Sequence, residues 1–143
     1  MFIGEYNHTI DSKGRLIMPS KFRSELGEKF YITKGMDNCL FVFPQEEWDK
    51  IDKKINNLKL SRREARAFAR LFYAGAIDVG LDKQGRTLIS QNLRDYASLK
   101  KDIVIIGVST RIEIWDKEIW DRYNDDDLLD YNSLTDSLTD LDL

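Results

Sequence analysis

One stretch of the sequence occurs twice, first as Asp11-Ser12-Lys13-Gly14-Arg15-Leu16-Ile17-Met18 and again as Asp82-Lys83-Gln84-Gly85-Arg86-Thr87-Leu88-Ile89. The two copies lie 71 positions apart, and the match continues through Phe22/Leu93 and Arg23/Arg94. Farther along, at an offset of 72, the matched pairs are Leu40/Ile112, Phe43/Trp115 and Trp48/Trp120. Because paired aromatic residues follow both motifs in the same register, we interpret the pattern as a duplication of a unit of about 45 residues.

The residues around each motif are typical of a β-hairpin. Apolar and polar residues alternate before it, around Tyr6, His8 and Ile10 and again around Ile77, Val79 and Leu81, as in a strand with one buried face. An Asp that bonds its own backbone opens a turn, and a Gly three residues later tolerates a positive φ. We therefore expect Asp11, Gly14, Asp82 and Gly85 to form the turns, with Arg15 and Arg86 at the exits of the two tips.

Both units are expected to continue in the same order. A short helix follows each motif, between Pro19 and Gly27 in the first unit and after the N-cap Ser90 in the second. Two strands come next, over 30–33 and 40–43 and then over 102–106 and 111–115, and an amphipathic helix follows over 45–56 or 117–123. Between the units, the capping-box pattern Ser61-Arg62-Arg63-Glu64 predicts a helix from Ser61 to about Tyr73.

A unit of about 45 residues is too small to bury a stable core alone, whereas two units with their helices are large enough. The sequence thus predicts a β-rich α+β fold. In it, two duplicated hairpin units interleave into one small barrel with pseudo-two-fold symmetry and peripheral helices. We divide the chain into a first repeat (1–48), a helical connector (49–75), a second repeat (76–122) and an acidic, mobile tail (123–143).

Charge and composition restrict the class of protein further. The 143 residues carry a net charge of −3, but residues 121–143 contain eight Asp and a single Arg, so residues 1–120 carry +4. A mildly basic body suits a polyanionic partner. No apolar run is long enough to span a membrane, and the N-terminus lacks a signal peptide, so we expect a cytoplasmic protein without a membrane partner.

The sequence lacks the residue sets of common enzymes. It has one cysteine, Cys39, and one histidine, His8, which exclude an internal disulfide, a His/Cys zinc site and a Cys–His nucleophile pair within one chain. Neither a P-loop nor a G-x-G-x-x-G motif is present. We therefore expect no enzymatic activity, no cofactor and no metal site.

The motif D-x-x-G-R followed by Leu16-Ile17-Met18-Pro19 resembles the SpoVT/AbrB-type swapped-hairpin module. Two such motifs after the opening Met1-Phe2-Ile3-Gly4-Glu5-Tyr6 are similar to the bacterial MraZ family, over roughly residues 1–122. The resemblance implies a cytoplasmic, nucleoid-associated transcriptional regulator of the division and cell-wall gene cluster. It also implies a homo-oligomeric ring of about eight or more subunits that binds double-stranded DNA with short direct repeats through Arg15 and Arg86.

The chemistry of arginine agrees with this implication. A guanidinium is planar and permanently charged, and its fork of donors can bind a phosphate or grip guanine O6 and N7 in the major groove. Lys13 and Lys83 can add phosphate contacts. The alternative is a structural turn in which Arg15 pairs with Asp11, and Arg86 with Asp82, without further function.

Other patterns have competing interpretations. The basic face formed by Arg62, Arg63, Arg66 and Arg70 could be a second DNA surface, but we favour a solvated face or pairing with carboxylates of an adjacent subunit. The many aromatic residues favour packing or a subunit interface over stacking on single-stranded bases. The leucines of the tail allow a short amphipathic helix. That tail could mimic DNA or dock on a partner, which leaves an AbrB-type, antitoxin-like interaction module as the alternative function.

Overall fold

The structure, a computed structural model, describes residues 1–138, 140 and 141. The first repeat and the connector contain β1 (Phe2–Thr9), β2 (Arg15–Ile17), α1 (Ser20–Leu26), β3 (Phe30–Lys34), β4 (Leu40–Pro44), α2 (Gln45–Asn56) and α3 (Arg63–Gly75). The second repeat contains β5 (Ile77–Val79), β6 (Arg86–Leu88), α4 (Gln91–Tyr96), β7 (Asp102–Ser109), β8 (Arg111–Asp116) and α5 (Lys117–Asn124). The tail contains the 3-10 helix η1 (Asp127–Leu129) and α6 (Tyr131–Ser137).

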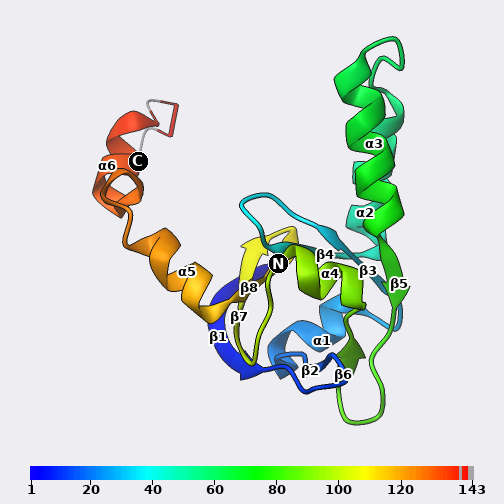
Figure 1. Cartoon of the computed structure of the whole chain (residues 1–143), viewed down its shortest axis with the longest axis vertical. Coiled ribbons are helices and arrows are strands. Elements are labelled where there is room, and N and C mark those ends of the chain that lie inside the picture. The colour runs from blue at the N-terminus through cyan, green and yellow to red at the C-terminus, as the bar shows by residue number, and fades with distance from the viewer. Residues whose placement is uncertain (139, 142–143) are drawn as a thin grey trace.

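The strands form one antiparallel six-stranded sheet, in the order β1-β7-β8-β4-β3-β5, and a separate two-stranded ribbon of β2 and β6 (Figure 1). Each repeat gives its first strand to the other repeat, because β1 pairs with β7 and β5 pairs with β3. The predicted α+β fold of two interleaved, duplicated units is thereby confirmed.

The strand register shows the pseudo-two-fold symmetry residue by residue. When the two repeats are exchanged, the strand order of the sheet reads the same backwards. In the ribbon Leu16 pairs with its own repeat equivalent, Thr87, and in the sheet Phe41 pairs with its equivalent, Glu113. The pseudo-axis therefore passes through the centre of the ribbon and through the β4–β8 pair.

The expected barrel does not close in the part of the chain that the structure describes. β1 and β5 form the two ends of the six-stranded sheet. The three-residue strands β2 and β6 pair with each other, and a single bridge between Ile10 and Leu16 connects the ribbon to the end of β1. Strands this short cannot join both sheet edges, so the result is an open, curved sheet with a ribbon beside it.

The core belongs to both repeats at once. One cluster of buried apolar residues contains Leu16, Met18 and Phe22 of the first repeat together with Ile89 and Leu93 of the second. Phe22 packs edge-on against Phe2 with ring centroids 5.4 Å apart. Neither unit therefore buries its apolar face without the other. Because Leu16 of the ribbon belongs to this shared core, the core holds the ribbon in place.

The peripheral helices differ between the repeats. In the first, α3 folds back on α2, and Trp48 stacks on Phe72 with centroids 5.4 Å apart. In the second, Trp115 packs against Trp120 at 5.1 Å, and the chain continues away from the sheet through α5 into α6. Figure 1 shows the α2–α3 hairpin and the tail on opposite sides of the molecule.

Two local expectations need correction or completion. Helix α3 starts at Arg63, with Arg62 as an N-cap that makes no side-chain cap bond, so the predicted capping box at Ser61 is wrong. A turn closed by Arg62 N–H on the Lys59 carbonyl places Ser61 before the helix. In the tail, Asp126 caps η1 and Asp130 caps α6, so a short helix is present, while its mobility and our domain boundaries stay predictions.

Candidate nucleic-acid interface

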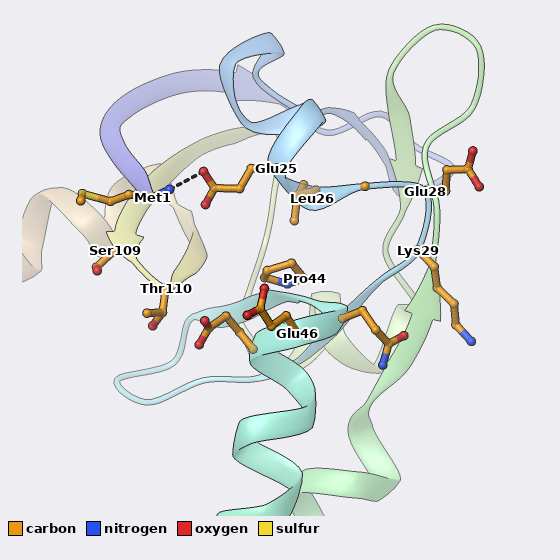
Figure 2. A pocket seen from close by; sticks show the side chains of 12 residues that line it. Met1, Glu25, Leu26, Glu28, Lys29, Pro44, Glu46, Ser109 and Thr110 are labelled. Atoms are coloured by element: carbon orange, nitrogen blue, oxygen red, sulfur yellow. Dashed lines mark hydrogen bonds and ion pairs between the residues drawn. The ribbon is translucent and has the colours of Figure 1, made fainter.

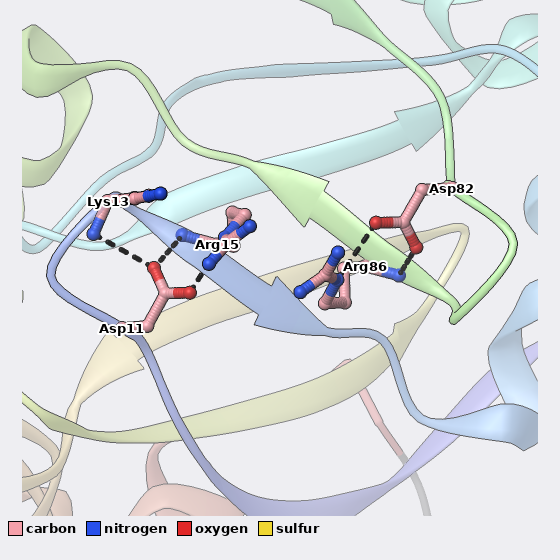
Figure 3. A network of polar contacts seen from close by, with 5 residues as sticks. All are labelled: Asp11, Lys13, Arg15, Asp82 and Arg86. Atoms are coloured by element: carbon pink, nitrogen blue, oxygen red, sulfur yellow. Dashed lines mark hydrogen bonds and ion pairs between the residues drawn. The ribbon is translucent and has the colours of Figure 1, made fainter.

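Each D-x-x-G-R motif folds into the same tight turn. The Asp11 carboxylate accepts hydrogen bonds from the backbone N–H groups of Lys13 and Arg15, both at 2.9 Å (Figure 3). Gly14 N–H closes the turn on the Asp11 carbonyl at 3.0 Å. Asp82 makes the same set of bonds in the second repeat, with Gln84 in the place of Lys13. The two tips thus make the same backbone bonds, while their single lysines occupy different positions on the turn.

The same aspartates orient the motif arginines. Arg15 Nε donates to Asp11 Oδ2 and Arg86 Nε donates to Asp82 Oδ2, each at 2.8 Å. The backbone N–H of the arginine, and then its side chain, hold the pKa of each aspartate below its ordinary value. Since these carboxylates are exposed, the pairs add little stability. Their effect is positional, because each guanidinium is fixed through one nitrogen.

The remaining nitrogens of the two guanidinium groups are unused. Among the described residues, no hydrogen bond involves the Nη atoms of Arg15 or Arg86. Their side chains are 35% and 31% exposed. The Arg–Asp pairing that we considered as a purely structural alternative is therefore present. It occupies only Nε of each arginine and leaves the fork formed by the two Nη groups available to a ligand.

The register of the ribbon places both arginines on one face. Arg15 pairs with Leu88 and Ile17 pairs with Arg86. Side chains alternate along a strand, so these four point away from the core while Leu16 and Thr87 are buried. Ile17 and Leu88 are 45% and 54% exposed. The outer face thus carries two guanidinium groups and two aliphatic side chains, related by the pseudo-axis.

Two further arginines lie behind the tips, and sequence reasoning missed their role. Arg23 Nε donates to the Met18 carbonyl at 2.9 Å, and Arg94 Nε donates to the Ile89 carbonyl at 3.1 Å. Each one packs against the tip glycine of the other repeat, Arg23 against Gly85 and Arg94 against Gly14. Their matched positions in the two repeats were the available signal.

The lysines of the tips are less symmetric. Lys13 is equivalent to Gln84, whereas Lys83 is equivalent to Ser12, so the two ammonium groups occupy different positions on their turns. Both residues are exposed, and no ion pair involves either side chain in the described part of the chain. They add positive charge beside the ribbon without a fixed orientation.

The basic face of α3 lies away from the ribbon (Figure 1). Arg66 donates to the Leu60 carbonyl at 2.8 Å, which fastens the turn before the helix. Because α3 belongs to the projecting hairpin, its arginines and those of the tips do not form one continuous surface. The aromatic residues of α2 and α3 pack in one cluster and those of α5 pack with Trp115 in another, so they present no platform beside the ribbon.

The remaining candidate groups show no features of a catalytic site. Burial, and then the nearby Glu113 carboxylate, raise the pKa of the Cys39 thiol, so it is not an activated nucleophile. Partial burial, and then the charge of Arg23, lower the pKa of His8. The described residues contain no group of three or more His, Cys, Asp or Glu side chains that could hold a metal ion.

A separate pocket lies beside the N-terminus and is acidic (Figure 2). Its lining includes Glu25, Glu28, Glu46 and Glu47, and the terminal ammonium group of Met1 pairs with Glu25. Four carboxylates would repel a phosphate backbone, so this pocket is not part of the candidate nucleic-acid surface.

None of the helices in the described residues has the length and apolar character that crossing a bilayer requires.

Comparison with known proteins gives consistent matches over the whole chain. The family model described as "MraZ protein, putative antitoxin-like" matches twice, over residues 1–71 and 72–141. A "Transcriptional regulator MraZ" of Finegoldia magna is 62% identical over 143 residues, which cover 100% of both chains. Proteins of the same name from Clostridium tetani and a Thermoanaerobacter species are 55% and 52% identical, with 99% and 100% of each chain covered.

Proposed function

The chain belongs to the MraZ family, and from this premise we propose that it regulates transcription by binding double-stranded DNA through the outer face of the β2–β6 ribbon. The shared name of its relatives, transcriptional regulator, supports a regulatory rather than an enzymatic role. The observation that carries the proposal is the pair of guanidinium forks on that face, each fixed at Nε and open at both Nη atoms.

The ribbon has the chemistry of a major-groove reader. B-DNA admits a two-stranded ribbon in its major groove, where an arginine fork fits guanine O6 and N7. Ile17 and Leu88 stand beside the arginines and can contact thymine methyl groups. Lys13 and Lys83, with Arg23 and Arg94 behind the tips, add positive charge for the phosphates on either side of the groove.

An oligomer would multiply these contacts. We propose a ring of about eight or more subunits that binds short direct repeats upstream of the division and cell-wall gene cluster, which makes the protein nucleoid-associated. Each ribbon alone offers few contacts, so tethering several of them raises the affinity through effective concentration. Repeated DNA sites suit such an arrangement better than one isolated palindrome.

A second function rests on the tail. Leu128 and Tyr131 are exposed on capped helical turns, as expected of a segment that docks on another protein. An antitoxin-like interaction module would use this segment, and the ribbon would then be dispensable for its activity. A protein that co-purifies through residues 123–143, with no retention on DNA, would favour this second function.

The test compares ribbon variants of the full-length chain on one DNA probe. A duplex enriched from a random-sequence library by the unmodified protein serves as the probe, and fluorescence anisotropy gives Kd over a range of salt concentrations. Loss of a bidentate base pairing costs roughly 1–3 kcal/mol, so we expect Arg15→Ala and Arg86→Ala each to weaken binding about tenfold or more. The log–log salt dependence should become less steep by about 0.9 for each phosphate that the variant no longer neutralises.

Two further variants make the result specific. Arg15→Lys retains the charge but loses the fork, so it should bind unrelated duplex normally while its preference for the selected probe falls. Arg122→Ala removes an exposed arginine from α5 and should leave Kd unchanged. An Arg15→Ala/Arg86→Ala double variant with normal mass, normal circular dichroism and unchanged Kd would refute the proposed DNA surface.

A further inference from the structure

The hairpin of α2 and α3 presents a surface that no part of the chain described by the structure covers. Arg62, the N-cap of α3, and Arg63 and Arg70 of the helix are exposed, and so are the apolar residues Phe68 and Leu71. No carboxylate pairs with these arginines among the described residues. Exposed apolar side chains rimmed by polar residues mark an interaction site, and unpaired cations beside them suit an acidic, apolar segment.

An apolar groove lies along this hairpin. Phe41 and Phe43 of β4, Ile51 and Ile55 of α2, and Phe68 and Phe72 of α3 line it, together with Lys34 and Lys54. Met36 stands exposed in the same lining. The groove therefore combines an apolar floor with ammonium groups, and the guanidinium groups of α3 lie on the adjoining helix face.

The tail has the complementary chemistry. Leu128 and Tyr131 are 82% and 77% exposed, and Leu138 is also exposed. Asp125, Asp126, Asp127, Asp130 and Asp136 surround them, and neither η1 nor α6 has a buried residue. Side-chain caps hold these turns in shape. The segment is thus preformed, acidic and apolar, and it lacks a partner within the described part of its own chain.

The two surfaces do not meet within one chain, because the hairpin and the tail lie on the two sides of the molecule with the sheet between them (Figure 1). We propose that η1 and α6 of one copy dock in the groove of the α2–α3 hairpin of a second copy. This inference rests on the oligomer of the proposed function and identifies its contact surface. A contact between two different surfaces is head-to-tail, and it closes into a ring where the rotation between copies allows it.

The apolar side chains of the tail decide between this occupant and the acidic pocket near the N-terminus, since both carry carboxylates. The arginines of α3 could also approach Glu46 or Glu47 of another copy, but that pocket already holds the Met1 ammonium group against Glu25. The tail offers exposed leucines as well as carboxylates. Only the tail therefore satisfies both the apolar groove and the cations beside it.

The test is photo-cross-linking within the full-length oligomer. The photoreactive residue p-benzoylphenylalanine replaces Tyr131, and unlabelled and ¹⁵N-labelled copies are mixed before irradiation. We expect adducts that join residue 131 of one copy to residues 45–75 of a copy with the other label. The same label at Leu88, which is exposed on the ribbon, is the control and should give no adduct with residues 45–75.

The outcomes separate this inference from the DNA-binding proposal. Adducts confined to one copy, adducts to any other region of a second copy, or no adduct would each overturn the inference, whatever the anisotropy data show. The side chains of Asp127 and Asp136 make no cap bonds, so Asp127→Arg/Asp136→Arg should lower the adduct yield severalfold without unfolding the tail. An unchanged yield in that variant would contradict the electrostatic part of the contact.

Discussion

The two tip glycines occupy equivalent positions, but the atom nearest to an added Cβ differs between them, so the same substitution should have unequal effects. Gly14 has φ +87° and Gly85 has φ +77°, a backbone region in which an L-residue costs roughly 1–2 kcal/mol. A Cβ at Gly14 would lie 2.7 Å from the backbone oxygen of Ile89. The three heavy atoms nearest to a Cβ at Gly85 all belong to the Arg23 side chain, at 2.3–2.7 Å.

The Arg23 side chain and the Ile89 carbonyl differ in how freely they can move away from an added methyl group. The guanidinium end of Arg23 can swing away from a new methyl group and lose its bond to the Met18 carbonyl. The Ile89 carbonyl belongs to the backbone that joins the ribbon to the core, because Ile89 N–H donates to the Gly14 carbonyl at 2.8 Å. Moving it adds overpacking strain of about 1–3 kcal/mol. We therefore expect Gly85→Ala to lose about 1–2 kcal/mol and Gly14→Ala about 2–5 kcal/mol of unfolding free energy.

Urea unfolding at one fixed protomer concentration measures the difference, with light scattering to show that both variants retain the parent mass. Gly27→Ala is a reference for backbone strain alone, since φ at Gly27 is +74° and a Cβ there meets nothing within 4 Å. If Gly14→Ala were as stable as Gly85→Ala, or more so, the argument that the ribbon is held rigidly through Ile89 would be wrong.

Two other consequences of the structure are measurable. Thr87 Oγ1 is buried without a hydrogen-bond partner in the described residues, so Thr87→Val should raise the free energy of unfolding by about 1 kcal/mol in a thermal scan. Thr33→Val is the control and should lower it, because the Thr33 hydroxyl donates to the Phe72 carbonyl at 2.8 Å. A loss of stability in Thr87→Val would contradict this reasoning. NMR titration of the single histidine should give His8 a pKa below 6.5. The unfolded chain then binds the proton more readily than the folded one, so the free energy of unfolding should decline as the pH falls below about 6.5. His8→Gln should reduce this decline.

Much of the fold could be predicted from the sequence because the duplication repeats its local signals. The Asp and Gly of each motif encode one turn, and Ser90 caps α4 as its position suggests, accepting a bond from Leu93 N–H. The interleaving followed from the size of one unit, which cannot bury a core alone. These are local or additive properties, and a single sequence contains them.

Properties that depend on the geometry between the repeats could not be predicted in the same way. The failure of the barrel to close depends on β2 and β6 pairing with each other, a register that no local pattern encodes. Arg23 and Arg94 were visible as matched residues, but their contacts with Gly85 and Gly14 cross from one repeat to the other. The start of α3 at Arg63 depends on the preceding turn, which competes with the capping box at Ser61.

The contrast between the symmetric centre and the asymmetric periphery has a physical reason. Arg15 and Arg86 make equivalent bonds to Asp11 and Asp82, as the proposed function requires, since both tips would then hold an arginine fork against one polyanion. A head-to-tail contact between copies instead needs two different surfaces, a donor and an acceptor. The helices that follow β4 and β8 provide that difference, with a basic, grooved hairpin after the first repeat and an acidic, leucine-bearing tail after the second. If cross-links join the tail to the hairpin of a neighbouring copy, the two repeats have stayed symmetric in the ribbon, where both would bind the same ligand. They have diverged in the peripheral helices, where each would contact a different surface of another subunit.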